Sequence, residues 1–122
     1  MKKILLITVL MLGVIFIGSA KIGAQMNNEI TQVRAQHILV PDENEAKAVK
    51  NEIESGKITF EDAAEKYSEC PSKANGGDLG YFGRGMMVKE FEQAAFDGTV
   101  GKVSNPVQTQ FGWHLIKVID KK

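Results

Sequence analysis

The sequence predicts a single α+β domain with a mostly antiparallel sheet, and three observations carry that prediction. The chain has 122 residues, 43% of them hydrophobic, which gives room for one compact core. Segments with the two-residue alternation of strands stand at both ends of the domain, with segments of helical spacing between them. The last two strands are close enough in sequence to form a hairpin, which favours antiparallel pairing.

The first strand and the first helix of the domain have clear boundaries. The side chains of residues 33–40 alternate between two faces, which predicts a strand that ends at Pro41. We expect Asn44 to cap the helix that follows, and Gly56 stands where a left-handed residue ends a helix. The apolar positions of this helix are Ala46, Val49 and Ile53.

A second helix and an irregular segment come next. Thr59 is followed by Asp62 three positions later, a pattern typical of a helix start. The apolar stripe of this helix consists of Phe60, Ala63, Ala64 and Tyr67. Residues 70–77 are rich in proline, serine, asparagine and glycine, which indicates a turn or a short irregular helix.

The second half of the domain is predicted to hold a short strand, a helix and two further strands. Residues 79–82 form the short strand, among glycines that permit close backbone approach. The helix that follows ends before Gly98. Its apolar positions are Met87, Phe91, Ala94 and Ala95. Residues 103–107 and 113–120 are the last strands, joined by a hairpin connection over 109–112.

The first 20 residues have the pattern of an export signal. Two lysines precede an apolar run over residues 4–17, and small residues lead up to Ala20. The run is shorter than the roughly 20 apolar residues of a comfortable membrane span, so cleavage after Ala20 is favoured over a retained anchor. Residues 21–32 then form a polar leader and 33–122 the domain of an exported protein, which contacts a membrane only if the signal is retained.

Charge and cysteine content exclude several classes of function. Without its first 20 residues the chain has 13 basic and 15 acidic side chains, a net charge of −2, and no basic stripe that would bind nucleic acid. One thiol, Cys70, and two histidines without a CxxC pair make a poor metal site, so we expect no metal and no cofactor. Cys70 is either a shielded functional thiol or a small buried hydrophobe.

The two histidines, His37 and His114, both lie on predicted strands among apolar residues. If those strands pair, the imidazoles come within hydrogen-bonding reach, because a neutral imidazole donates from one ring nitrogen and accepts at the other. The pattern alone favours the other interpretation, in which each histidine is a separate residue of the core or the surface.

Six blocks of sequence resemble the parvulin-type peptidyl-prolyl isomerases in order and spacing. They are residues 34–40 (RAQHILV), 67–70 (YSEC), 75–82 (NGGDLGYF), 85–87 (GMM), 90–91 (EF) and 105–114 (NPVQTQFGWH). The resemblance covers the whole expected domain. It implies a four-stranded antiparallel sheet surrounded by helices, of the FKBP-like superfold. It also implies an enzyme that isomerises X-Pro bonds of exported or unfolded polypeptides and so assists protein folding, and we expect it to be a monomer.

The resemblance also implies which residues form the site. His37 and His114 match the paired histidines at the centre of the sheet, and Cys70 matches the position beside the rotating bond, as a thiolate or as a weakly polar wall. The positions that match the slot for the proline ring are Leu79, Met87 and Phe91. The positions that match the further lining of the site are Phe82 and Thr109.

One departure from the family bears on the substrate. Family members that require phosphorylated Ser or Thr before proline carry a basic loop after the first strand, whereas residues 41–45 here are short and acidic. A phosphate would be repelled, so we expect no preference for phosphopeptides. An apolar residue before the proline is the expected choice.

Two other functions are compatible with these residues. The same groove in a binding module would hold unfolded exported chains as a small chaperone, without catalysis. A hydrolase would use Cys70 as nucleophile and His37 or His114 as base.

Overall fold

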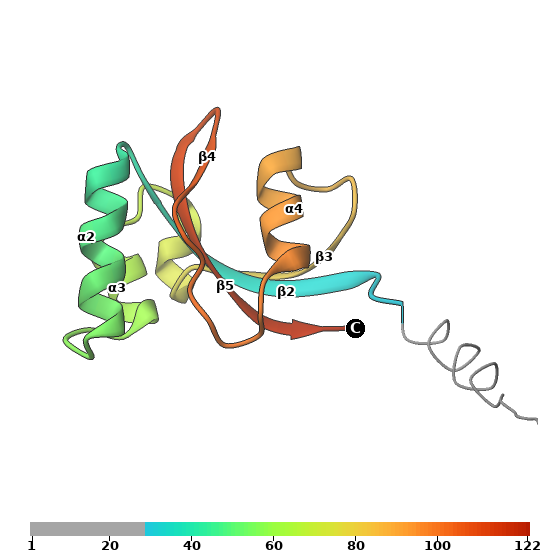
Figure 1. Cartoon of the computed structure of the whole chain (residues 1–122), viewed down its shortest axis with the longest axis horizontal. Coiled ribbons are helices and arrows are strands. Elements are labelled where there is room, and N and C mark those ends of the chain that lie inside the picture. Colours follow the sequence, from blue (N-terminus) through green and yellow to red (C-terminus); the bar gives the residue numbers. More distant parts are fainter. Residues whose placement is uncertain (1–28) are drawn as a thin grey trace, which may run out of the picture.

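Four antiparallel strands form the centre of the computed structural model, which describes residues 29–122 (Figure 1). The strands are β2 (Gln32–Val40), β3 (Asp78–Gly83), β4 (Val107–Thr109) and β5 (Gly112–Lys121), and their order in the sheet is β3-β2-β5-β4. The expected α+β class and four-stranded antiparallel sheet are thus confirmed. The export signal and most of the polar leader lie outside the described residues, and no helix within 29–122 is long and apolar enough to cross a membrane.

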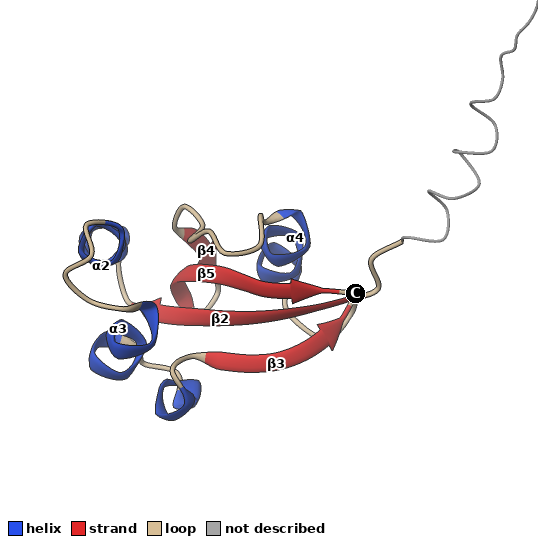
Figure 2. Ribbon diagram, turned by 90° about the horizontal axis from the view of Figure 1, so that it is seen from below, coloured by secondary structure: helices blue, strands red, loops and turns tan. Residues whose placement is uncertain are grey.

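Three α-helices and one 3₁₀ helix of residues 29–122 surround the sheet. They are α2 (Glu43–Glu54), α3 (Phe60–Tyr67), the 3₁₀ helix η2 (Pro71–Asn75) and α4 (Lys89–Asp97). Figure 2 shows α4 well apart from α2 and α3 along the sheet. The expected irregular segment is the 3₁₀ helix, in which Pro71 occupies the first turn, where its missing N–H costs nothing.

Strand β2 contributes to two separate hydrophobic cores because both of its faces are covered. Val33 and Ala35 pack with α4, whereas Ile38 and Val40 pack with α2 and α3. Successive side chains of a strand point to opposite faces, so α4 lies on one face of the sheet and the α2–α3 pair on the other.

The start of α2 differs from the expectation, because its N-cap is Asp42 and not Asn44. Asp42 has an extended backbone, and its carboxylate accepts a hydrogen bond from the Glu45 N–H at 2.8 Å. The predicted end at Gly56 is confirmed by its φ of +83°. The predicted cap at Thr59 is also confirmed, since its hydroxyl accepts from the Asp62 N–H.

Two further element boundaries were wrong. The strand expected over 103–107 is only an isolated bridge at Val103, and β4 begins at Val107. Pro106 has no N–H for a ladder, and the Ile116 N–H donates to the Ser104 hydroxyl in place of a backbone carbonyl. Met87 lies just before α4, which begins at Lys89 after its cap residue, Val88.

Candidate active site

The register of β2 and β5 brings the two histidines together. Leu39 pairs with His114 and His37 with Ile116, so the two imidazoles are diagonal neighbours on the face covered by α4. Their Nδ1 atoms are 3.1 Å apart, and the rings are stacked with 17° between their planes. Phe91 of α4 presents an edge-on contact to both rings, at centroid distances of 5.4 and 5.2 Å. The pair expected from the sequence is therefore present.

Both outer nitrogens of the pair also have hydrogen-bond partners. His37 Nε2 lies 3.1 Å from the Ser72 hydroxyl, and His114 Nε2 lies 2.8 Å from the Thr109 hydroxyl. The Thr109 oxygen also accepts from the Phe111 N–H at 3.1 Å. A neutral imidazole has one N–H, so the hydrogen bonds of this chain all run in one direction, either from Thr109 through His114 and His37 to Ser72 or the reverse. The chain of bonds fixes the orientation of both rings.

Burial keeps the two imidazoles neutral. It lowers the pKa of His37 to about 4, with a smaller contribution from the charge of a protonated His114. Burial likewise lowers the pKa of His114 to about 4. A desolvated imidazolium has lost its hydration, and no carboxylate bonds to either ring to compensate within the described residues. At neutral pH the pair therefore carries no charge.

An apolar cavity of about 480 Å³ opens beside the histidine pair. Six of the eight site residues expected from the sequence line it, namely His37, Cys70, Leu79, Met87, Phe91 and His114. The remaining lining residues were not expected from the sequence, and they are Leu39, Glu69, Pro71, Met86, Val88 and Phe111. Glu69 is the only one of the twelve with an acidic side chain.

The other two expected residues, Phe82 and Thr109, do not line this cavity. Phe82 is 1% exposed and packs beneath Phe91, at a centroid distance of 6.1 Å. Thr109 is also buried and reaches the site only through its bond to His114. Both residues therefore support side chains that face the cavity and do not face it themselves.

The segment that carries Cys70 is held against the end of β2 by backbone contacts. The Glu69 N–H donates to the Leu39 carbonyl at 2.8 Å, and the buried Ser68 hydroxyl accepts from the Leu39 and Cys70 N–H groups. Beyond η2, Gly77 accepts from the His37 N–H at 2.9 Å. These contacts fix both ends of the segment beside His37.

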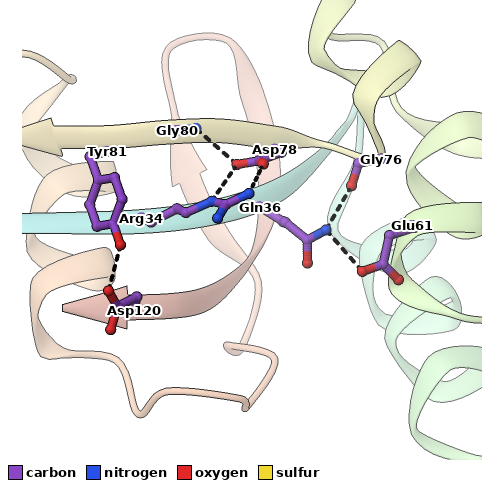
Figure 3. A network of polar contacts seen from close by, with 8 residues as sticks. All are labelled: Arg34, Gln36, Glu61, Gly76, Asp78, Gly80, Tyr81 and Asp120. Carbon is purple, nitrogen blue, oxygen red and sulfur yellow. Dashed lines mark hydrogen bonds and ion pairs between the residues drawn. The ribbon is translucent and has the colours of Figure 1, made fainter.

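A polar network on the opposite face of β2 ties the same segment to the rest of the fold (Figure 3). The buried Gln36 amide donates to the Glu61 carboxylate at 3.0 Å and to the Gly76 carbonyl at 3.3 Å. Arg34 pairs with Asp78 at the start of β3, and this ion pair lowers the pKa of Asp78. The hydrogen bond from Gln36 similarly lowers the pKa of Glu61. Of two adjacent residues of β2, His37 thus belongs to the site on one face, and Gln36 on the other face holds the segment after α3 in place.

The sheet, the paired histidines and the apolar cavity together define the rotamase class of domain. Residues 39–120 match the family model of the rotamase, PPIC-type PPIASE domain, and the chain belongs to this family.

The relatives within this family include foldases. The foldase protein PrsA of Geobacillus kaustophilus is 53% identical over 97 residues, which is 79% of this chain and 34% of that protein. The structure of the peptidylprolyl isomerase PrsA from Bacillus anthracis matches with a TM-score of 0.74 and 42% identity, over 86% of this chain and 48% of that one. NmPin, the parvulin of Nitrosopumilus maritimus, matches with a TM-score of 0.67 and 42% identity, over 74% and 97%. The chain spans about a third of the length of the curated foldases it matches.

Proposed function

We propose that the chain is a peptidyl-prolyl cis/trans isomerase that assists the folding of exported polypeptides. The observation that carries the proposal is the apolar cavity whose wall includes the hydrogen-bonded pair of His37 and His114. Membership of the rotamase family and the likeness to PrsA foldases support the same activity. The reaction breaks no bond, so the protein has to hold a proline ring and the carbonyl before it and needs no cofactor.

The barrier to rotation explains why an apolar cavity suits this reaction. Rotation about a peptide bond faces a barrier of about 20 kcal/mol because amide resonance is lost at the twisted geometry. At X-Pro bonds the uncatalysed exchange takes tens of seconds or longer. The planar amide is more polar than the twisted one, so an apolar cavity disfavours the planar ground state relative to the transition state. In this scheme Leu79, Met87 and Phe91 hold the proline ring.

The histidine pair contributes a rigid wall without charge. An imidazolium beside the substrate carbonyl would stabilise the polar planar amide, and the low pKa values of His37 and His114 prevent that charge at neutral pH. Thr109 acts as a positioning residue, because the hydrogen bond between its hydroxyl and His114 Nε2 holds the imidazole ring in place. The role of the pair is therefore to orient and to exclude charge, and proton transfer to substrate is not required.

Cys70 fits the role of a small, weakly polar wall better than that of a thiolate. Both nitrogens of each imidazole are engaged with other partners, so neither ring bonds to the Cys70 sulfur within residues 29–122. A thiolate needs a nearby cation or hydrogen-bond donor. Cys70→Ala and Cys70→Ser test this role: both are expected to keep the rate of exchange within about threefold, whereas a 100-fold loss in both would indicate a thiolate.

The same contacts argue against a hydrolase that uses Cys70 as nucleophile. Such an enzyme needs a hydrogen bond from the nucleophile to its base, and the ring nitrogens of His37 and His114 are occupied by each other, Ser72 and Thr109. Covalent capture of Cys70 by an electrophilic peptide carbonyl is the signature of that alternative.

We propose a substrate without a phosphate before the proline. Glu69 lines the cavity, whose lining includes no arginine or lysine, and the turn after β2 is acidic, with Asp42, Glu43 and Glu45 at the start of α2. The Glu69 carboxylate repels a phosphate, which binds best to clustered arginines. A higher kcat/KM for phospho-Ser-Pro than for Ala-Pro peptides would contradict this part of the proposal.

Export of the domain is a proposal that rests on the sequence of the first 20 residues and on the likeness to PrsA foldases. Cleavage after Ala20 gives a mature chain that begins at Lys21. Mass spectrometry of the protein recovered from an expressing bacterium distinguishes this chain from one that retains residues 1–20 as an anchor.

The decisive experiment is an exchange measurement on residues 21–122. Two-dimensional NMR exchange on an uncharged peptide such as Ala-Leu-Pro-Ala with blocked ends gives the cis/trans rate with and without protein. We expect a rate that rises with protein concentration and falls at least tenfold when Leu79, in the cavity wall, is replaced by Asp. No acceleration by the intact domain would overturn the proposal.

A chaperone that holds unfolded chains without catalysis is the second candidate, and exposed apolar side chains at the cavity mouth favour it. Met86 and Phe111 are 68% and 61% exposed. A His37→Ala/His114→Ala variant separates the two functions: if it still suppresses aggregation of a denatured protein and no longer accelerates exchange, holding is an activity of its own.

A further inference from the structure

Every sulfur atom within residues 29–122 belongs to a side chain that lines the apolar cavity. The three residues are Cys70, Met86 and Met87, and the remaining methionines of the chain all precede residue 29. Cysteine and methionine sulfurs are the groups that peroxides oxidise most readily in proteins. Within the described part of the chain, mild oxidation by a peroxide therefore falls on the wall of the cavity.

The two methionines differ in how well a peroxide reaches them. Met86 is 68% exposed, more than any other large apolar residue within 29–122. Met87 is only partly exposed, because it packs against the core that contains Phe82 and Phe91. A thioether has no proton to lose before it reacts, so accessibility decides which of the two methionines is oxidised first. That methionine is Met86.

The loop that carries Met86 does not need a thioether at that position. The Gly83 N–H donates to the Met86 sulfur at 3.3 Å, and the Gly85 N–H donates to the Glu92 carboxylate of α4 at 2.6 Å. Thioether sulfur is a weak hydrogen-bond acceptor and a sulfoxide oxygen is a stronger one, so the Gly83 N–H keeps a partner after oxidation. Oxidation of Met86 thus adds a polar atom at the surface, whereas oxidation of Met87 would place one against the core.

We propose that Met86 is a modification site, where a peroxide reversibly converts the apolar mouth of the cavity into a polar one. An electron pair of the thioether sulfur forms a bond to one peroxide oxygen, the O–O bond breaks, and the other oxygen leaves as water or as an alcohol. The sulfur is oxidised by two electrons to a sulfoxide. Methionine sulfoxide reductases return the sulfoxide to the thioether with electrons from a dithiol.

The sulfoxide changes what the cavity binds. Met86 and Phe111 both line the cavity and are both exposed, so they lie where it opens to solvent. A ligand that covers a thioether gains from the burial, but one that covers a sulfoxide has to remove its hydration. We expect the affinity for an apolar ligand to fall about fivefold, the low end for a polar group that is buried without a partner. The oxidation is independent of the isomerase proposal, and its effect on substrate rests on that proposal.

The experiment oxidises the full chain with hydrogen peroxide and compares the wild type with Met86→Leu and Met87→Leu. Leucine keeps an apolar side chain of similar size and has no sulfur. The reaction is run at about pH 5, where thiolates are scarce, which limits the competing oxidation of cysteine. Tryptic digestion gives a peptide of residues 85–89, and its fragment ions assign each added oxygen to Met86 or to Met87.

Two probes measure binding to the cavity before oxidation, after oxidation and after treatment with the two methionine sulfoxide reductases, one for each sulfoxide epimer. They are the peptide Ala-Leu-Pro-Ala with blocked ends and the uncharged apolar dye Nile red, and neither measurement needs turnover. A chain that binds the dye and not the peptide counts against the isomerase proposal, and the dye then gives the test of Met86.

The proposal predicts that Met86 gains oxygen about tenfold faster than Met87, with an unchanged midpoint of thermal unfolding. The wild type oxidised at Met86 should bind the probes about fivefold more weakly and regain its affinity with the reductases. Met87→Leu should respond like the wild type, and Met86→Leu should keep its affinity in peroxide. Equal oxidation of the two methionines, an unchanged affinity after oxidation at Met86, or a loss of affinity that Met86→Leu shares would overturn the proposal.

Discussion

The two faces of the sheet differ in how completely their cores are packed. On one face, α2 and α3 close over Ile38, Val40 and Phe60, all of which are almost fully buried. On the other, α4 covers only part of the strands, and Leu79 and Met87 remain partly exposed around a cavity. The candidate site thus lies on the face where side-chain packing is incomplete. The face covered by α2 and α3, called the filled face below, contributes stability.

The largest expected effect of a single substitution belongs to the filled face. Phe60→Ala removes a buried aromatic ring and lowers the free energy of unfolding by about 4 kcal/mol. Because Phe60 is remote from the cavity lining, kcat/KM per folded molecule is expected to stay within twofold. Urea unfolding and NMR exchange measure the two quantities.

On the face that carries the cavity, Leu79→Ala is expected to have a small effect on stability and a large one on activity. The free energy of unfolding falls by about 1 kcal/mol and kcat/KM falls about tenfold. Equal stability losses in both variants would remove the contrast.

Gly77 connects the two faces, and its replacement tests how tightly the site is held. A Cβ at Gly77 would lie 2.4 Å from the His37 carbonyl oxygen, and its φ is +85°. We expect Gly77→Ala to lower the free energy of unfolding by about 3 kcal/mol, from the clash together with the left-handed backbone. Gly80 is the matched control, since its φ is +72° but nothing lies within 4 Å of a Cβ there. Gly80→Ala is expected to cost about 1 kcal/mol. Similar losses in thermal unfolding for both variants would show that the contact with His37 is loose.

The pH dependence of the free energy of unfolding tests whether His37 and His114 are buried and neutral. Both imidazoles have a pKa lowered from 6.5 to about 4, so the unfolded chain binds more protons than the folded one between these values. Stability is therefore fully present above pH 6.5 and is lost as the pH falls toward 4. We expect the pair to account for a loss of about 6 kcal/mol at pH 4, about 3 kcal/mol for each imidazole, measured by urea unfolding. The His37→Gln/His114→Gln variant should lack this part of the slope, and an unchanged slope would contradict the burial of the pair.

The smallest expected effect concerns a single hydroxyl. Thr109→Val leaves the Phe111 N–H and His114 Nε2 without their partner, which costs about 1 kcal/mol and lowers kcat/KM about fivefold. Ser104→Ala is the control, because the Ser104 hydroxyl accepts from the Ile116 N–H away from the cavity. It is expected to cost similar stability and no activity. Equal kcat/KM in the two variants would exclude a positioning role for Thr109.

Much of the fold and the centre of the site could be predicted from the sequence because they depend on local patterns. Alternation along two strands placed His37 and His114 where pairing brings them together, and the resemblance supplied Cys70, Leu79 and Phe91. The sequence could not show that Asp42 and not Asn44 caps α2, because both residue types cap helices. The extended backbone at Asp42 determines where the helix begins.

The places of Met86 and Phe111 in the cavity lining could not be predicted from the sequence, for a different reason. Met86 and Phe111 sit in short connections, and nothing in their local sequence shows that the two loops face one opening. Phe82 and Thr109 illustrate the converse, since the resemblance implied that both line the site, whereas each contacts a lining residue from behind. The three-dimensional arrangement of loops decides which side chains face the cavity and which support it from behind.

The central claim is that the imidazole pair beside the apolar cavity is neutral, and the pH profile of catalysis tests it most directly. NMR exchange on Ala-Leu-Pro-Ala with blocked ends should give a kcat/KM that is constant from pH 8 to about 5 and falls as the pH approaches 4, where the pKa values of His37 and His114 lie. The His37→Ala/His114→Ala variant should be slower and lack this fall. A transition centred near pH 6.5, the value of an exposed histidine, would show that the pair is charged in the working enzyme and would contradict the mechanism.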